Sequence, residues 1–102
     1  MRVKRGVSLK VLQPQMVLAS QIVEPILNRY GQEGVITSGC EGVHSKNSKH
    51  YIGYALDFRH RDMDSEMTKR RAAKEMQEAL GAEYYVMYED SHIHVQYNGS
   101  TA

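Results

Sequence analysis

Apolar residues recur every three or four positions between Pro14 and Tyr30, a spacing that predicts one amphipathic helix. Pro14 suits the first turn and Gly31 the exit, while Pro25 predicts a kink or a split into two pieces. The apolar face of this helix would consist of Met16, Ala19, Val23, Ile26, Leu27 and Tyr30. We expect this face to pack on the core.

A second helical pattern begins at Asp64 or Ser65, either of which can cap it, and ends at Gly81. Its other face is charged, which is typical of a helix lying on the surface of a core. The methionines of this segment are predicted to fill the core. Its apolar positions are Met67, Ala72, Ala73, Met76, Ala79 and Leu80.

Short apolar or alternating runs between and after the helices predict strands over residues 35–37, 54–59, 84–89 and 92–97. Residues 39–49 form a predicted polar loop. The expected fold is α+β, a small antiparallel sheet covered on one face by about two helices. We expect a single domain over residues 1–102, with residues 98–102 as a loose tail.

The amino-acid composition and net charge favour a globular domain and exclude several other classes of protein. The chain is 41% hydrophobic and 25% charged, close to the average for globular domains. Its net charge of +1 gives no electrostatic reason to expect nucleic acid as the main partner. We find neither a secretory signal nor a membrane-spanning stretch, so we expect cytoplasmic synthesis, no membrane insertion and a monomer. The lone Cys40 excludes an intrachain disulfide and a cysteine-based zinc knuckle.

Histidines cluster in two segments, residues 43–61 and 89–96. Side chains alternate across a sheet, so Asp57 lies on the opposite face from its apolar neighbours, and His92 and His94 do the same in the last strand. If the apolar residues face the helices, these three side chains converge on the open face. His44 and His60 are predicted to be loop residues.

Residues 90 and 91 separate the last two predicted strands. A tight antiparallel hairpin at Asp90-Ser91 would place Glu89 opposite His92 and on the same face. Asp-Ser is not a favoured pair for such a turn, so a longer loop is the alternative. The hairpin register predicts that Glu89 joins the cluster.

Two imidazoles and a carboxylate suit a catalytic zinc site, whose fourth position holds a water with a pKa lowered to around 7. A nearby carboxylate can accept the proton of that water. Glu89 is the first candidate for this base and Asp90 the second. The spare histidine would stabilise the oxyanion, and strand alternation admits either His92 or His94 as the ligand.

The run from Ser48 to Asp57 fits the Ser-x-His-x-x-Gly-x-Ala-x-Asp pattern of the zinc D-alanyl-D-alanine carboxypeptidase superfamily. This superfamily includes phage L-alanyl-D-glutamate endopeptidases and the Hedgehog signalling domain. Residues 89–95 are similar to its second motif, an acidic residue before His-x-His. The resemblance extends loosely over residues 9–98. It is greatest with compact bacteriophage members, through residues 36–39, His44-Ser45 and residues 48–50.

By this resemblance, His50, Asp57 and His94 would hold one Zn²⁺ ion. His92 would assist at the transition state and Glu89 would be the base. The implied activity is hydrolysis of peptide bonds in peptidoglycan stem peptides. The enzyme would act at the bacterial cell wall, after release as a phage endolysin or as part of a virion.

Several residues around the motif keep alternatives open. Ser48 either binds substrate or fixes the loop before His50, and Gly53 and Ala55 would let backbone and substrate approach the metal. Some relatives have an acidic residue at the position of Ser91, so the choice of base between Glu89 and Asp90 remains.

Carboxypeptidase members usually carry an arginine just after the Ser-Gly turn to bind the terminal carboxylate of the substrate. This chain has Cys40-Glu41 there, which favours an endopeptidase over a D-alanyl-D-alanine carboxypeptidase. An alternative from another class is a noncatalytic, zinc-stabilised structural or binding module of a phage particle.

Overall fold

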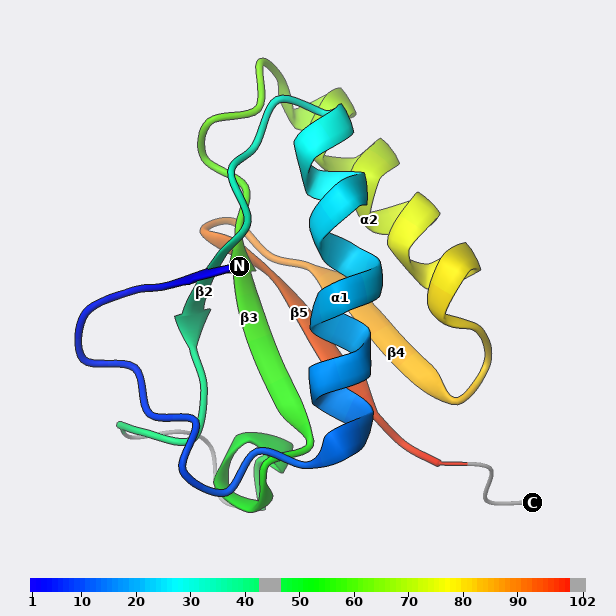
Figure 1. The fold of residues 1–102 in the computed structure, drawn as a ribbon. Coiled ribbons are helices and arrows are strands. Elements are labelled where there is room, and N and C mark those ends of the chain that lie inside the picture. The colour runs from blue at the N-terminus through cyan, green and yellow to red at the C-terminus, as the bar shows by residue number, and fades with distance from the viewer. Residues whose placement is uncertain (43–46, 100–102) are drawn as a thin grey trace.

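The computed structural model describes residues 1–42 and 47–99, which fold into one sheet with two helices on one face (Figure 1). The predicted α+β class and the covered face are confirmed. His44-Ser45 and the last part of the predicted tail, residues 100–102, lie outside the described residues. The elements in chain order are β1 (Arg2–Val3), α1 (Pro14–Arg29), β2 (Val35–Ser38), η1 (Lys49–Ile52, a 3₁₀ helix), β3 (Ala55–Arg59), α2 (Glu66–Leu80), β4 (Tyr84–Tyr88) and β5 (His92–Tyr97).

The strands lie in the order β1-β2-β3-β5-β4. The four predicted strands pair antiparallel, as predicted, and the unpredicted β1 adds a parallel pair with β2, so the sheet is mixed. Strand β1 has only two residues, too few for an alternating pattern to appear in the sequence. This pairing brings the amino-terminal segment alongside β2.

Helix α1 has the predicted buried positions, although Tyr30 caps its end and is only half-buried. The helix runs through Pro25 without the predicted split. A proline deprives the carbonyl four residues earlier of its helical hydrogen bond. Both Pro25 and Gln21 lie on the exposed side, where water can solvate that carbonyl.

Helix α2 begins after Ser65, whose side chain accepts a hydrogen bond from the Thr68 amide, and ends at Gly81, as predicted. Two predicted core positions are wrong, because Ala79 is exposed and Met67 is 69% exposed. Met67 lies in the first turn of the helix, and Met63, just before the helix, is buried in the core instead. No described helix is long and apolar enough to cross a membrane.

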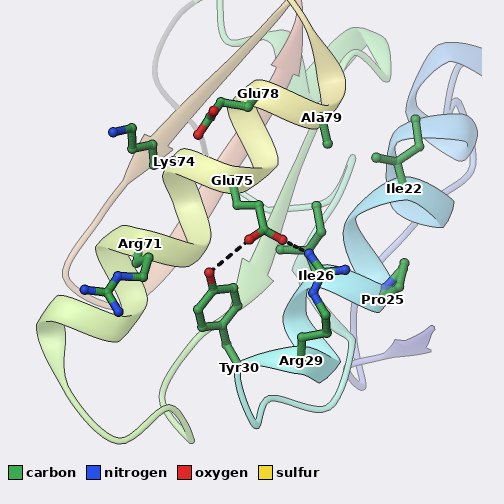
Figure 2. A pocket seen from close by; sticks show the side chains of 10 residues that line it. All are labelled: Ile22, Pro25, Ile26, Arg29, Tyr30, Arg71, Lys74, Glu75, Glu78 and Ala79. Carbon is green, nitrogen blue, oxygen red and sulfur yellow. Dashed lines mark hydrogen bonds and ion pairs between the residues drawn. The ribbon is translucent and has the colours of Figure 1, made fainter.

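The two helices contact each other along a pocket of about 800 Å³ on the outer side of the molecule, which we call the helical pocket (Figure 2). Glu75 of α2 reaches into the pocket between two residues at the end of α1. It pairs with Arg29 and accepts a hydrogen bond of 3.0 Å from the Tyr30 hydroxyl. These contacts connect the helices across the pocket.

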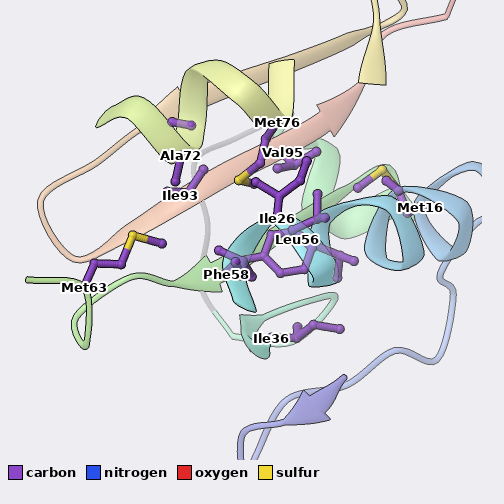
Figure 3. Packing of buried hydrophobic residues seen from close by; sticks show 14 residues of the cluster. Met16, Ile26, Ile36, Leu56, Phe58, Met63, Ala72, Met76, Ile93 and Val95 are labelled. Carbon is purple, nitrogen blue, oxygen red and sulfur yellow. The ribbon is translucent and has the colours of Figure 1, made fainter. Parts of the chain in front are cut away.

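The hydrophobic core lies between the helices and the inner face of the sheet (Figure 3). Leu56 and Phe58 of β3 and Ile93 and Val95 of β5 point into it and are fully buried. Burial of side chains of this size contributes roughly 1.5–3 kcal/mol each before conformational entropy is counted. This strong preference fixes the faces of β3 and β5, and therefore decides which residues lie on the open side.

Candidate metal centre

The open face of the sheet carries the residues that alternate with the core. In the β3–β5 ladder Asp57 pairs directly with His94, and Arg59 pairs with His92. Because Leu56 and Ile93 face the helices, these four residues lie on the other side. The predicted convergence of Asp57, His92 and His94 is confirmed.

His50 reaches the same place from η1, which the sequence pattern did not predict. The Ser48 hydroxyl accepts a hydrogen bond of 3.2 Å from the His50 amide and so caps this short helix. The loop-fixing role of Ser48 is therefore observed, and its substrate contact stays a prediction. Gly53 ends η1 in the left-handed region, with φ of 79°.

The close approach predicted at Gly53 is made by the protein's own backbone. A Cβ atom on Gly53 would lie 1.9 Å from the carbonyl oxygen of Val11. The Gly53 carbonyl also accepts a hydrogen bond from the Gln13 amide. Glycine is needed here so that the segment before α1 can pack against η1 and hold it beside the sheet.

Three histidines surround the carboxylate of Asp57. Its Oδ1 lies 2.9 Å from His94 Nδ1 and 3.3 Å from His50 Nε2, and its Oδ2 lies 3.6 Å from His92 Nε2. One ligand atom from each of His50, Asp57 and His94 lies within 4.8 Å of the other two. Asp57 is 8% exposed and His50 4%. These three residues could hold a metal ion.

Both candidate histidine ligands have their second ring nitrogen occupied. His50 Nδ1 donates to the carbonyl oxygen of Gly39 at 2.9 Å, which leaves Nε2 directed toward Asp57. His94 Nε2 lies 2.8 Å from Oε1 of Gln96, whose amide nitrogen donates to Asn98 at 2.7 Å. Gln96 thus holds His94 Nε2 while Nδ1 faces Asp57. Metal-binding histidines are usually oriented by such partners.

The charges of the cluster depend on one another. Burial alone would raise the pKa of Asp57, but hydrogen bonds from His50 and His94, with the charges of His50 and His92, hold it well below its usual range. Burial would lower the pKa of His94. The hydrogen bonds to Asp57 and Gln96, with the charges of Asp57 and Glu89, outweigh burial and raise it. The carboxylate is therefore ionised and ready to bind a cation.

The β4–β5 hairpin has the tight register that Asp90-Ser91 predicted. The Glu89 amide donates to the His92 carbonyl at 2.9 Å. The charge of Glu89 is close enough to help raise the pKa of His94, whereas Asp90 lies in the exposed turn. His92 Nδ1 lies 2.9 Å from the Ser91 hydroxyl.

His60 lies in the loop after β3, as predicted, but it is only 1% exposed. Its Nε2 donates to the Glu89 carbonyl at 2.7 Å, and its ring stacks on Tyr88. His60 thus holds the hairpin that carries Glu89 and His92. The alternation of Leu56 and Phe58, extended by one step, predicts a buried residue at this position.

Glu41 has a structural role that sequence reasoning missed. Its carboxylate accepts hydrogen bonds from the Ser8 amide at 2.8 Å, the Gly39 amide at 2.9 Å and the Ser38 hydroxyl at 3.1 Å. Burial would raise the pKa of Glu41, but these bonds lower it. A Cβ atom on Gly39 would lie 2.4 Å from the Ser8 carbonyl oxygen, so this position requires glycine. Glu41 therefore fixes the turn whose Gly39 carbonyl orients His50.

Comparisons of the chain with protein-family models, with curated proteins and with solved structures gave no match. Functional inference for this protein accordingly depends on its residues and their geometry.

Proposed function

We propose that this protein is a zinc-dependent peptidase that cuts peptide bonds in peptidoglycan stem peptides, and that it is an endopeptidase. The observation that supports this most is the group of His50, Asp57 and His94, whose ligand atoms lie within 4.8 Å of one another while an oxygen atom holds the other ring nitrogen of each histidine. Two imidazole nitrogens and one carboxylate oxygen are the ligand set of many catalytic zinc sites. The resemblance of residues 48–57 to the zinc peptidase motif supports the reaction type.

Zinc bound here would polarise the substrate carbonyl and lower the pKa of a water molecule to around 7. Glu89 would accept the proton of the attacking water and deliver it to the leaving amine. We prefer Glu89 to Asp90 because Glu89 lies opposite His92 in the hairpin and on the same face of the sheet, whereas Asp90 is exposed in the turn. His92, on the same face next to Asp57, would donate a hydrogen bond to the oxyanion.

The contacts of Glu41 support an endopeptidase over a carboxypeptidase. At the place where carboxypeptidase relatives have a cation for the terminal carboxylate, this chain has an anion that is already bonded to Ser8, Ser38 and Gly39. A carboxylate of the substrate would be repelled there. We therefore propose cleavage within the stem. The place of action would be the cell wall, reached after release or as part of a virion.

Zinc content and wall digestion test this function together. Purified wild type should bind one zinc ion per chain and release new amino termini from purified peptidoglycan, detected by mass spectrometry. Glu89→Gln should keep its zinc and lose about 10²- to 10⁴-fold in rate, the usual contribution of a general base. Glu78→Gln, an exposed acid on α2, is the matched control and should change neither.

Two outcomes would contradict the proposal. Stoichiometric zinc with no new amino termini, in wild type as in Glu89→Gln, would indicate the noncatalytic zinc module. Release of terminal D-alanine alone would indicate a carboxypeptidase.

A further inference from the structure

A second pocket, of about 450 Å³, opens beside the candidate metal centre where β3 ends and the β4–β5 hairpin turns. We call it the sheet-end pocket. Asp57 and His92 of the cluster are part of its wall. A ligand in this pocket would therefore lie against the proposed metal ligand Asp57 and against His92.

Four cations from separate parts of the chain line this pocket. Lys4 follows β1, Arg59 ends β3, Arg61 comes after it, and Lys69 belongs to α2. The acidic residues of the wall are Asp57 and Asp90. Asp57 is already surrounded by three histidines, so its charge is directed to the metal site. The rest of the wall has an excess of positive charge.

These cations are poorly matched by the protein itself. Within residues 1–42 and 47–99, no carboxylate forms an ion pair with Lys4, Arg59 or Lys69, and Arg61 has only a 3.9 Å contact with Asp62. A single unpaired lysine on a surface is ordinary. Several cations around one concavity raise the local concentration of anions.

Arg59 is the best placed of the four. It is half-buried on a central strand, on the same face as Asp57, and pairs with His92 in the ladder. Residues two apart on a strand are separated by about 7 Å, the length of roughly two residues of an extended peptide. An anion on Arg59 would thus belong to a residue next to, or one away from, the scissile bond.

We infer that the sheet-end pocket binds a carboxylate of the substrate, so that the enzyme prefers stem peptides whose carboxyl group beside the scissile bond is free to those in which it is amidated. This inference rests on the proposed function. Arg59 is the main ligand, because a guanidinium can donate two parallel hydrogen bonds to a carboxylate. Lys4 and Lys69, which also line the pocket, add positive charge.

Two synthetic stem peptides that differ only in this carboxyl group, free or amidated, test the inference. The zinc-loaded wild type should cut the free acid with a kcat/KM about 10- to 100-fold higher, as expected for a charge-assisted contact. Arg59→Gln should lose that preference by losing activity on the free acid while its activity on the amide changes little. Arg71→Gln, an exposed arginine of the helical pocket, is the matched control and should keep the preference.

Equal kcat/KM for the two peptides in wild type would overturn the inference and leave the peptidase intact. An equal loss on both peptides in Arg59→Gln, with zinc content or unfolding midpoint changed, would also overturn it, since Arg59 would then be structural. Binding of the same peptides, followed by NMR titration, separates the two proposals. If neither peptide is cut but the free acid binds in an Arg59-dependent way, the pocket inference stands and the proposed hydrolysis fails.

Discussion

The helical pocket and the sheet-end pocket differ in their chemistry, and the larger of the two has the less promising chemistry. The helical pocket, of about 800 Å³, contains an acid that is satisfied by the protein, because Glu75 bonds to Arg29 and Tyr30 (Figure 2). The sheet-end pocket, of about 450 Å³, has Asp57 and His92 on one side and unmatched cations on the other. Size therefore does not indicate which pocket adjoins the candidate metal centre.

The difference follows from what each face of the fold must do. The helical pocket forms where two amphipathic helices meet, and its charges connect them. On the open face of the sheet, the side chains point away from the hydrophobic core, so packing of the core does not determine which residues stand there. Asp57, His92 and His94 nevertheless make a buried or half-buried polar cluster there. Such a cluster is costly for a small domain unless its charges are paired, and here Asp57 is paired with His92 and His94.

Replacing Asp57 or Glu75 with alanine should distinguish most clearly between a side chain that binds metal and one that stabilises the fold. Asp57→Ala removes a proposed ligand and should lower zinc affinity by more than about 100-fold, beyond the effect of losing an outer partner. Glu75→Ala should leave zinc affinity unchanged and lower the free energy of unfolding by about 0.5–1.5 kcal/mol. Chelator competition and urea unfolding measure the two effects. Equal zinc affinity in the two variants would remove the distinction between the pockets.

Much of the site could be predicted from the sequence because strand alternation and the core are strong signals. Leu56 and Phe58 decide the face of Asp57, and Ile93 and Val95 decide the face of His94. The length of the Asp90-Ser91 turn gives the position of Glu89. These relations are local or follow from burying apolar side chains.

The remaining features depend on contacts between distant segments. His50 lies on a 3₁₀ helix with no periodicity, and the role of Glu41 comes from a hydrogen bond to Ser8, 33 residues away. The sheet-end pocket requires β1 beside β2, a pairing of two residues in each strand. Polar contacts of this kind leave no regular pattern in the sequence.

Two glutamines offer a finer test of the same contrast. Gln96 on the open face orients His94, whereas Gln77 of α2 bonds to the backbone of Gly81, Tyr84 and Val86. Gln96→Ala should weaken zinc binding by about 10- to 100-fold with little loss of stability. Gln77→Ala should unfold at a lower urea concentration and bind zinc as the wild type does. A wild-type zinc affinity in Gln96→Ala would show that this hydrogen bond does not prepare the ligand.

The smallest expected effect is on the protonation of His94 and on the number of protons released when zinc binds. The pKa of His94 is raised in the metal-free protein, so its charged form adds stability below the unfolded value of about 6.5, and this is lost as pH rises through the folded pKa. Zinc needs the neutral ring, so zinc affinity should rise with pH over the same range, by up to about tenfold per pH unit for one competing proton.

Calorimetry in buffers of different ionisation enthalpy measures the protons released by zinc at pH 7. A histidine with an unshifted pKa would release only about 0.2 proton there, and His94 should add more. Gln96→Ala removes one cause of the raised pKa and should release fewer protons, whereas Glu75→Ala, in the helical pocket, should release as many as wild type. An identical release in all three proteins would mean that the Gln96 contact does not govern the protonation of His94, and that the polar cluster is less coupled than its distances indicate.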